Sequence, residues 1–430
     1  MFVPRSARRV RFVRAAFVSA VLLPSALLVT WAVLRRSAAH RDAIRMEWER
    51  AIGLPIAVET VEHPLPGVVR ARGCSLAAPD GRPVLATAGV RVEFSPTEVR
   101  IGIEAIDCDP AGAGLLAALA QDWLRRGARF RRAVVVDVAD LAWVSRGTDG
   151  VAVRRPVGAV RVECVMQGGD RAVRIVRRDA GDAADEARVV RAEPDGTGGE
   201  RLDVEASWHE PLPASILAAV CGGAVDVAPL GGSTVVRGRL AAACAGGRWT
   251  GSATGRVEGI DLAACTAALA GRAVGTMDVV VRGVEWRGGR LATADLTCDA
   301  PSGRVDRRLL ESLVSTLGCR AGPAFVGAAV ERDRVFDAVG CAIRIDGRGL
   351  ELAGSPRLGG ALAVAAGRPL LESPVGIVPL ERLAWMLAPS GAVYVPSSGP
   401  GSWLMSILPR GDAAVERTSQ VGAESGSGGF

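Results

Sequence analysis

Apolar and polar residues alternate with a period of two over most of the chain beyond residue 55. Turn-forming Pro, Gly and Asp residues separate the alternating runs, for example at residues 63–67 and 79–83. Short alternating runs joined by such turns are typical of an antiparallel meander. The runs are residues 56–62, 67–74, 84–94, 98–107, 132–144, 150–154, 157–166, 172–177, 188–192 and 202–208. With one helix predicted at residues 114–125, residues 46–210 are expected to form a β-rich region.

A weak internal repeat marks the next region, residues 211–390. Val235-Val-Arg-Gly238 recurs as Val280-Val-Arg-Gly283, and Gly246-Gly-Arg248 recurs as Gly288-Gly-Arg290. The matched motifs are 45 and 42 residues apart in the printed sequence, a spacing found in repeat proteins. We therefore predict two copies of a strand-rich unit here.

Each copy leads into a segment with helical signals, at residues 261–270 and 306–317. In both, an aspartate stands at the start and a glycine follows the end, as helix caps require. Further strands are predicted at 341–346, 349–353 and 361–366, and a short helix at 380–387. Residues 391–430 read as an apolar segment followed by a disordered tail. The predicted fold class is mainly β with a few short helices, in an extended antiparallel sheet.

An uncharged apolar run at residues 15–34 differs from everything after it. Twenty helical residues at ~1.5 Å each reach about 30 Å, the thickness of a bilayer core. Residues 1–14 carry five arginines and no acid, and Arg35-Arg36 closes the run. The positive-inside rule then leaves residues 1–14 as a cytoplasmic stub and sends the bulk of the chain across the membrane. We expect a single-pass protein of the bacterial inner membrane with a periplasmic β-rich region.

A cleaved signal peptide is the alternative for this run, and Ser37-Ala38-Ala39 resembles a cleavage site. Three features favour an uncleaved anchor. The run is longer than an ordinary signal-peptide core, Trp31 stands at its outer end, and Arg35-Arg36 occupies the place where a cleavage region is neutral. Both interpretations export the same region.

The basic composition follows from the membrane segment and not from nucleic-acid binding. Residues 1–45 hold nine arginines and one acid, a net charge of +8, whereas the whole chain carries +6, so the remainder sums to about −2. A nucleic-acid-binding domain needs a basic footprint of its own. We therefore expect no nucleic-acid partner.

Metal sites are not indicated. The nine cysteines are scattered without a CxxC motif, so zinc is not expected, and their odd number leaves at least one thiol unpaired. Some can pair in an oxidising compartment, but spacing assigns no bridge. The acidic loop at residues 179–195 lacks the ordered ligand spacing of a calcium loop and is interpreted as a solvated hairpin loop facing Arg174, Arg177 and Arg178.

Catalytic motifs are equally sparse, and we nominate no catalytic, cofactor-binding or metal-binding residue. His40, His63 and His209 are the three histidines, and none has metal-ligand spacing. His209-Glu210 can form half of an acid–base pair, but a polar strand end before a proline is the commoner explanation. The segment from Gly112 to Ala117 matches a loose GxGxxA pattern and is interpreted as a glycine-containing turn. The chain is not expected to be an enzyme.

Several strand patterns resemble the AsmA-like envelope proteins. Residues 52–61 (IGLPIAVETV), directly after the anchor, are similar to the opening strand of that family, and residues 67–81 to its second strand and turn. Residues 255–263 followed by residues 275–279 look like its alternation of a strand with a new strand. The resemblance covers residues 15–110 and 210–355 and consists of strand patterns, not of catalytic signatures.

This resemblance implies a groove-shaped, repeated β-sheet that shields lipid acyl chains, in lipid transport or in envelope and outer-membrane assembly. The composition is compatible, because a sheet lined by Val, Leu, Ala and Gly with only 4% aromatic residues can leave an apolar furrow open. The same residues can instead close into a packed core. A non-catalytic adaptor that docks another envelope protein, through sheet edges or the segment around Trp403, is the alternative function. A hydrolase that uses His209 and Glu210 is a third.

Overall fold

The structure is a computed structural model, and its fold is mainly β with a few helices and one apolar N-terminal helix, as the sequence predicts. It divides into two compact units, Met1–Asp107 with Val134–Asp140, and Cys108–Ala133 with Leu141–Phe430. The residues that the structure describes are 7–78, 81, 83–126, 132–146, 151–167, 169–178, 185–192, 201–222, 226–326, 333–387 and 400–409. The start of the predicted apolar segment, residues 391–399, and the predicted tail, residues 410–430, lie outside them.

The first unit begins with a continuous helical stretch, α1 (Ala7–Phe17), η1 (Val18–Leu22) and α2 (Leu23–Arg35). Within it, residues Arg11–Arg35 are long and apolar enough to span a membrane, and none of this span is buried in the protein. The widened π-helical turn η1 ends two residues before Pro24, which cannot donate a backbone hydrogen bond. The predicted span of residues 15–34 thus lies inside one uninterrupted helix.

A separate helix follows the apolar one in the first unit. α3 (Ala38–Ile52) starts at Ser37, whose hydroxyl accepts the His40 backbone N–H, and ends at Gly53 in the left-handed conformation. The antiparallel strands that come next are β1 (Ile56–Ala57), β2 (Thr60–Leu65), β3 (Val68–Ala77), β4 (Pro83–Phe94) and β5 (Glu98–Cys108). The predicted meander at residues 56–107 is confirmed.

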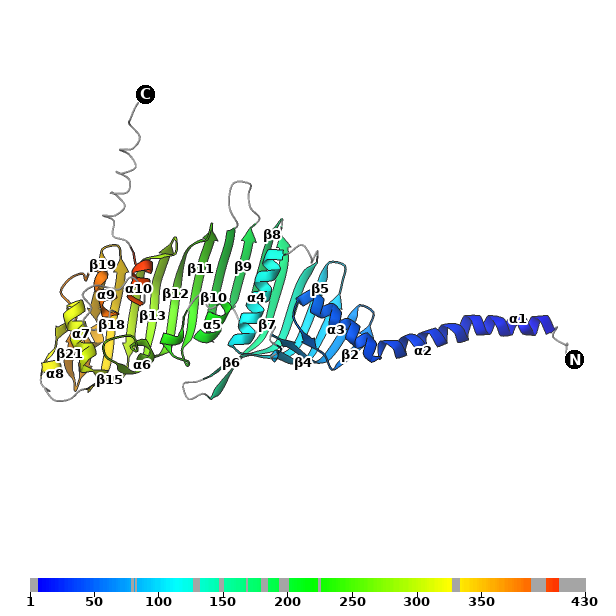
Figure 1. Cartoon of the computed structure of the whole chain (residues 1–430), viewed down its shortest axis with the longest axis horizontal. Coiled ribbons are helices and arrows are strands. Elements are labelled where there is room, and N and C mark those ends of the chain that lie inside the picture. The colour runs from blue at the N-terminus through cyan, green and yellow to red at the C-terminus, as the bar shows by residue number, and fades with distance from the viewer. Residues whose placement is uncertain are drawn as a thin grey trace, which may run out of the picture. The chain divides into compact units, whose positions relative to one another are not determined.

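The second unit contains a long antiparallel sheet in which sequential strands are neighbours (Figure 1). After β6 (Ala133–Arg146), which is divided between the units, the strands of this ladder are β7 (Ala152–Gln167), β8 (Asp170–Arg177), β9 (Glu186–Ala192), β10 (Arg201–Pro213), β11 (Val235–Ala245), β12 (Arg248–Asp261), β13 (Ala273–Arg287), β14 (Arg290–Ala300), β18 (Ala338–Asp346) and β19 (Gly349–Gly354). From β7 to β14 each strand pairs with the next, and β14 then pairs with β18 and β18 with β19.

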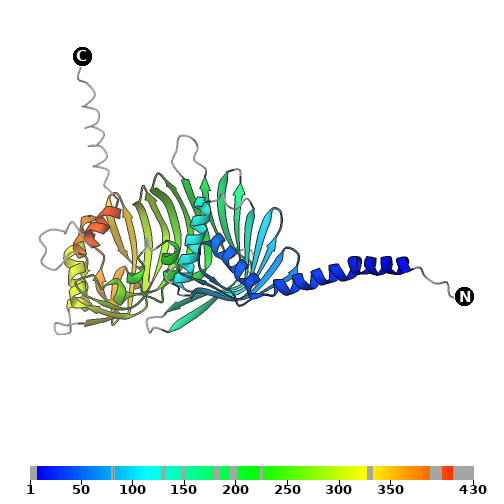
Figure 2. The ribbon, with the colours of Figure 1, turned by 45° about the vertical axis from the view of Figure 1, so that its right-hand side comes forward.

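Helices and shorter strands complete the second unit. They are α4 (Pro110–Arg126), α5 (Ala214–Val220), η3 (Ala228–Leu230), α6 (Leu262–Cys265), β15 (Gly303–Asp306), α7 (Arg307–Leu317), β16 (Arg320–Ala321), α8 (Pro323–Val326), β17 (Asp333–Phe336), η4 (Pro356–Leu358), β20 (Ala361–Ala365), β21 (Arg368–Glu372), α9 (Glu381–Met386) and α10 (Pro400–Ile407). α4 lies in front of the strands in both views of the ribbon (Figure 1, Figure 2). The helices of this unit therefore lie against a sheet, as predicted for residues 306–317.

The two repeat copies are two β-hairpins of this sheet. Gly246 and Gly247 form the turn between β11 and β12, and Gly288 and Gly289 form the turn between β13 and β14. All four have positive φ angles, which suits the two-residue turns that match the twist of a hairpin. The repeated glycine pair therefore specifies the turn geometry.

Two local predictions are wrong in instructive ways. The segment of Gly112 and Gly114 is not a turn, because it lies inside α4, where the Asp109 carboxylate accepts the Gly112 N–H at 2.8 Å and Pro110 fills the first helical position. The helix predicted at residues 261–270 ends at Cys265, one turn after its Asp261 cap. A cap starts a helix, but the length depends on what the helix packs against.

Candidate functional site

One face of the second unit's sheet is apolar across ten consecutive strands, and we call it the apolar face. Residues directly opposite one another in an antiparallel ladder point to the same side of the sheet. Following the register from β7 to β19 gives a single row of Val162, Ile175, Ala187, Ala206, Leu240, Ala253, Val284, Ala294, Ile345 and Leu350. Strands about 4.8 Å apart place the ends of this row roughly 43 Å apart along the sheet.

Neighbouring rows on the same side are apolar as well. One contains Cys164, Val173, Val189, Val204, Ala242, Gly251 and Trp286. Another contains Trp208, Gly238, Gly255, Val281, Leu296, Ile343 and Leu352. The apolar face is thus a band several residues wide that runs from strand to strand.

Helices cover the far end of the apolar face. The hydrophobic core of this unit contains Leu309, Leu310 and Leu317 of α7 and Leu380 and Leu408 near α9 and α10. Apolar-face residues of β14, β18 and β19 pack against it, namely Leu291, Cys341, Ile343, Ile345 and Leu352. Every member of this cluster among the described residues comes from residue 262 onward.

Helix α4 lies over the other end, held by two arginines of the apolar face. Arg171 Nη1 donates to the carbonyl oxygens of Leu124 and Arg125 at 2.8 and 2.9 Å, and Arg191 Nη1 donates to that of Leu124 at 3.1 Å. These carbonyls belong to the last turn of α4, where helix C-terminal oxygens lack internal partners and attract cations. α4 also packs closely on α5, since a Cβ at Gly114 would meet the Ala219 carbonyl oxygen at 3.5 Å.

Between these covered ends the apolar face stays half-exposed. In the middle of this face the side chains of β10, β11 and β12 are of intermediate exposure, namely Val204, Ala206, Leu240, Ala242, Ala253 and Val257, whereas Ile260 at the end of β12 is buried. In contrast, the core residue Leu370 is 0% exposed. A contiguous exposed apolar surface marks a binding site in soluble proteins, and on β10, β11 and β12 the described residues of this face include no charged group.

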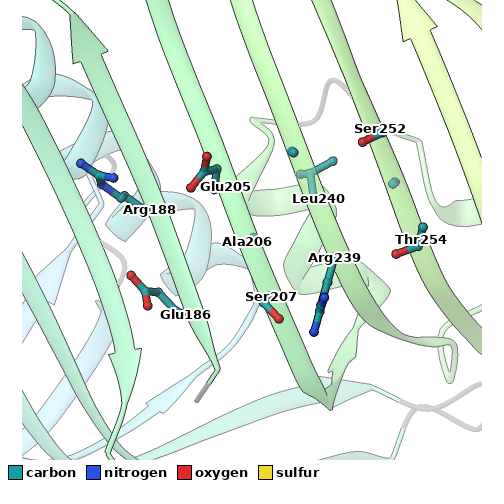
Figure 3. A pocket seen from close by; sticks show the side chains of 11 residues that line it. Glu186, Arg188, Glu205, Ala206, Ser207, Arg239, Leu240, Ser252 and Thr254 are labelled. Carbon is teal, nitrogen blue, oxygen red and sulfur yellow. The ribbon is translucent and has the colours of Figure 1, made fainter. Parts of the chain in front are cut away.

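The opposite face of the same strands is polar. A hollow of about 510 Å³ lies over β9 to β12 (Figure 3). Polar side chains line most of it, namely Glu186, Arg188, Glu205, Ser207, Arg239, Ser252 and Thr254, and Ala206, Leu240, Ala241 and Ala253 line the rest. Acidic and basic side chains alternate across it, and Glu186 already pairs with Arg174 at 2.7 Å. This balance of charge gives the hollow no strong field toward an ion of either sign, so we assign the apolar face, and not this hollow, as the candidate site.

The structure brings His209 to a partner that the sequence did not indicate. The fully buried Asp185 places Oδ1 3.0 Å from His209 Nδ1 and 2.6 Å from the His209 backbone nitrogen. Glu210 instead pairs with Arg177 Nη1 at 3.1 Å, and the same nitrogen lies 3.1 Å from Asp185 Oδ2. Among the described residues His209 has no hydroxyl or thiol hydrogen-bonded to it, so the cluster closes the ends of β8 to β10.

Asp185 also corrects the interpretation of the acidic loop. The predicted pairing with arginines is confirmed for Arg174 and Arg177, which bind Glu186 and Asp185. Asp185 is however buried, not solvated. Both oxygens of its carboxylate have hydrogen-bond partners, on Arg177 and His209, and these bonds offset the cost of burying the charge. Residues 179–184 and 193–195 of the loop lie outside the described residues.

Metal-binding and reactive-thiol chemistry find little support in the described part of the chain. It contains no group of three or more His, Cys, Asp or Glu side chains arranged to hold a metal ion. Burial raises the pKa of Cys164 and Cys319 to about 11, and that of Cys108 to about 12 with a contribution from Asp109. These cysteines are therefore neutral thiols that fill space in the apolar interior.

Comparison with family models, with curated proteins and with solved structures finds no match to this chain. The conclusion about function must therefore rest on its own residues. The resemblance of residues 52–61 and 255–263 to AsmA-like proteins remains a prediction.

Proposed function

We propose that this protein is a single-pass inner-membrane protein whose exported sheet binds the acyl chains of membrane lipids on its apolar face. The bulk of the chain would lie in the periplasm, and the role would be lipid transport or envelope assembly, as in the AsmA-like proteins it resembles. The observation that carries the proposal is the apolar row from Ala187 to Val284, whose side chains are of intermediate exposure and uncharged.

An acyl chain is the ligand that this surface suits best. It has no polar group along its length, so it needs no hydrogen-bond partner and accepts an uninterrupted apolar row. Burying each methylene contributes about 0.8 kcal/mol, so a dozen methylenes supply about 10 kcal/mol before the cost of ordering the chain is subtracted. The side chains of Ala206, Ala242 and Ala253 are short and extend little above the strands, which leaves room for a ligand on this face.

The N-terminal helix supports the same proposal from a different direction. A helix that can span a membrane holds the sheet near a source of lipid, and Arg5, Arg8, Arg9, Arg11 and Arg14 favour a cytoplasmic N-terminus. A non-catalytic role is part of the proposal.

Site-specific photocrosslinking tests the proposal on the full chain in cells. A photoreactive amino acid is placed at Leu240 or Ala253 on the apolar face, and at Arg239 or Ser252, which are their neighbours on the polar face. After irradiation, purified adducts are analysed by mass spectrometry for lipid. We expect phospholipid or lipid A adducts at Leu240 and Ala253 and none at Arg239 and Ser252. Equal lipid labelling on both faces, or none on either, would contradict lipid binding by the apolar face.

An adaptor that docks another envelope protein is the second candidate, and one residue favours it. The Trp403 side chain on α10 is 63% exposed, and exposed tryptophans are frequent anchors of protein interfaces. The same photocrosslinking at Trp403 distinguishes the candidates. A single protein adduct at Trp403, together with lipid-free apolar-face positions, would replace lipid handling by the adaptor role.

A further inference from the structure

Two cysteines face one another on neighbouring strands at the covered end of the apolar face. Cys298 of β14 lies directly opposite Cys341 of β18 in the antiparallel register. Such partners have Cα atoms about 4.5 or 5.5 Å apart, depending on the hydrogen-bonding pattern, and both values fall within the range that a disulfide spans. The backbone therefore needs no rearrangement to join them.

Their surroundings make the two thiols unequal. Cys298 is 6% exposed, whereas Cys341 is of intermediate exposure and packs against the core residues below α7 and α9. The Cys298 thiol donates a hydrogen bond to the Cys341 sulfur, which lowers the pKa of Cys341 despite its burial. The same bond and the burial raise the pKa of Cys298. Cys341 is thus the more accessible thiol of the pair.

We propose that Cys298 and Cys341 form a cross-strand disulfide when the chain meets a disulfide-bearing thiol oxidant. The Cys341 thiolate attacks one sulfur of the oxidant's disulfide and displaces the other as a thiolate, which leaves a mixed disulfide. Cys298 then loses its proton, attacks the Cys341 sulfur and releases the second oxidant thiol. Two electrons and two protons pass to the oxidant, which ends as a dithiol.

A third thiol competes for the same pair. Cys319 is 3% exposed and lies in the same core cluster, close enough for its charge to affect Cys341. We expect Cys341 to pair with Cys298 and not with Cys319. Cys298 and Cys341 are direct partners in the β14–β18 ladder, so the strand pairing holds them opposite one another. The bridge would tie β14 to β18 across the residues 301–337 that separate them in sequence, and so restrain the unfolded chain.

Formation in the cell rests on the proposed export, since thiols stay reduced in the cytosol. The experiment therefore has two arms. In the first, the purified full chain in detergent is reduced, exposed to oxidised glutathione, blocked with N-ethylmaleimide at low pH and digested with trypsin without reduction. In the second, cells that produce the full chain are blocked with the same reagent before lysis. Cleavage after arginine separates the three thiols into peptides 291–304, 309–320 and 335–344.

We expect peptides 291–304 and 335–344 to be linked in both arms. In the first arm, the effective concentration of two opposed thiols should make this link at least about tenfold more abundant than any other. Cys341→Ser should abolish it and Cys319→Ser should preserve it. Glutathione on the exposed Cys221 confirms that the oxidant acted.

The outcomes separate the two proposals. A dominant link to peptide 309–320, or full blocking of both Cys298 and Cys341 while Cys221 carries glutathione, overturns the disulfide. A link that forms with glutathione but is missing from cells supports the geometry of the pair and instead contradicts export of the second unit.

Discussion

The Nε2 atoms of His40 and His63 lie 2.8 Å apart, with their ring centroids separated by 5.0 Å. His40 belongs to α3, the helix that follows the apolar one, and His63 belongs to β2. This contact requires one Nε2 to carry a proton and the other to accept it. A proton on the accepting Nε2 would therefore remove the acceptor and set two N–H groups against one another.

The stability of the first unit should accordingly fall on acidification. Burial lowers the pKa of His63, and Arg35 and His40 lower it further. The unfolded chain therefore binds a proton near pH 6.5 that the folded chain resists, so this contribution is fully present above pH about 6.5 and is lost as the pH falls below it. Thermal unfolding from pH 7.5 to 5, together with hydrogen exchange in α3 and β2, measures the effect.

His63→Asn is the control for this titration. It removes the ring that resists protonation, so the pH dependence below 6.5 should become shallower. An identical slope in the variant would show that other groups cause the acid sensitivity.

Substitutions of leucine should distinguish the apolar face from the core. Leu370→Ala, at a 0% exposed position, is expected to cost about 2–5 kcal/mol of unfolding free energy because it leaves a cavity. Leu240→Ala on the half-exposed row should cost about 1 kcal/mol or less, since little packing is lost. Urea unfolding monitored in the second unit compares them. Equal losses would mean that Leu240 is packed as tightly as the core.

We expect the hydrogen bonds that Arg171 donates to stabilise the last turn of α4. Arg171→Met keeps the apolar stem but removes the donors to Leu124 and Arg125, and charge-assisted hydrogen bonds contribute about 1.5–3 kcal/mol each at most. We expect faster hydrogen exchange in the last turns of α4. Arg174→Met is the matched control, because Arg174 lies on the polar face and its exposed pair with Glu186 is expected to contribute about 0–1 kcal/mol.

Two facing glycines should be intolerant of any side chain. Gly238 and Gly255 are direct partners in β11 and β12, with φ angles of +149° and +154°. A Cβ at Gly238 would overlap the Thr254 carbonyl oxygen. Gly238→Ala should therefore cost more than about 2 kcal/mol, because both strain and overlap must be relieved. Gly283→Ala, with open space around its Cβ position, should be close to neutral, and melting temperatures compare the two.

The sequence predicted the strands well, because alternation and turn residues are local signals. The glycine pairs at residues 246–247 and 288–289 marked real hairpin turns, and Asp306 and Gly318 marked the true limits of α7. The fold class could therefore be predicted before any coordinate was known.

The candidate site could not be predicted to the same degree, because it depends on register. No local pattern reveals that Ala206, Leu240 and Ala253 lie in one row, since they come from three strands whose alignment is set by the whole sheet. The burial of Asp185 was missed for a related reason. Its partner His209 lies 24 residues away in sequence and reaches it only once β9 and β10 have paired.

The pairing of β7 to β14 in chain order has a consequence for biogenesis. If the part of the chain that follows the anchor crosses the membrane in chain order, each strand from β8 to β14 meets a neighbour that has already crossed. From β7 to β14 the sheet can form one hairpin at a time, because each strand pairs with the one before it in the chain and not with a distant one. Helices α9 and α10 follow every strand of the ladder in sequence, so they can cover its far end only after β19 has paired with β18.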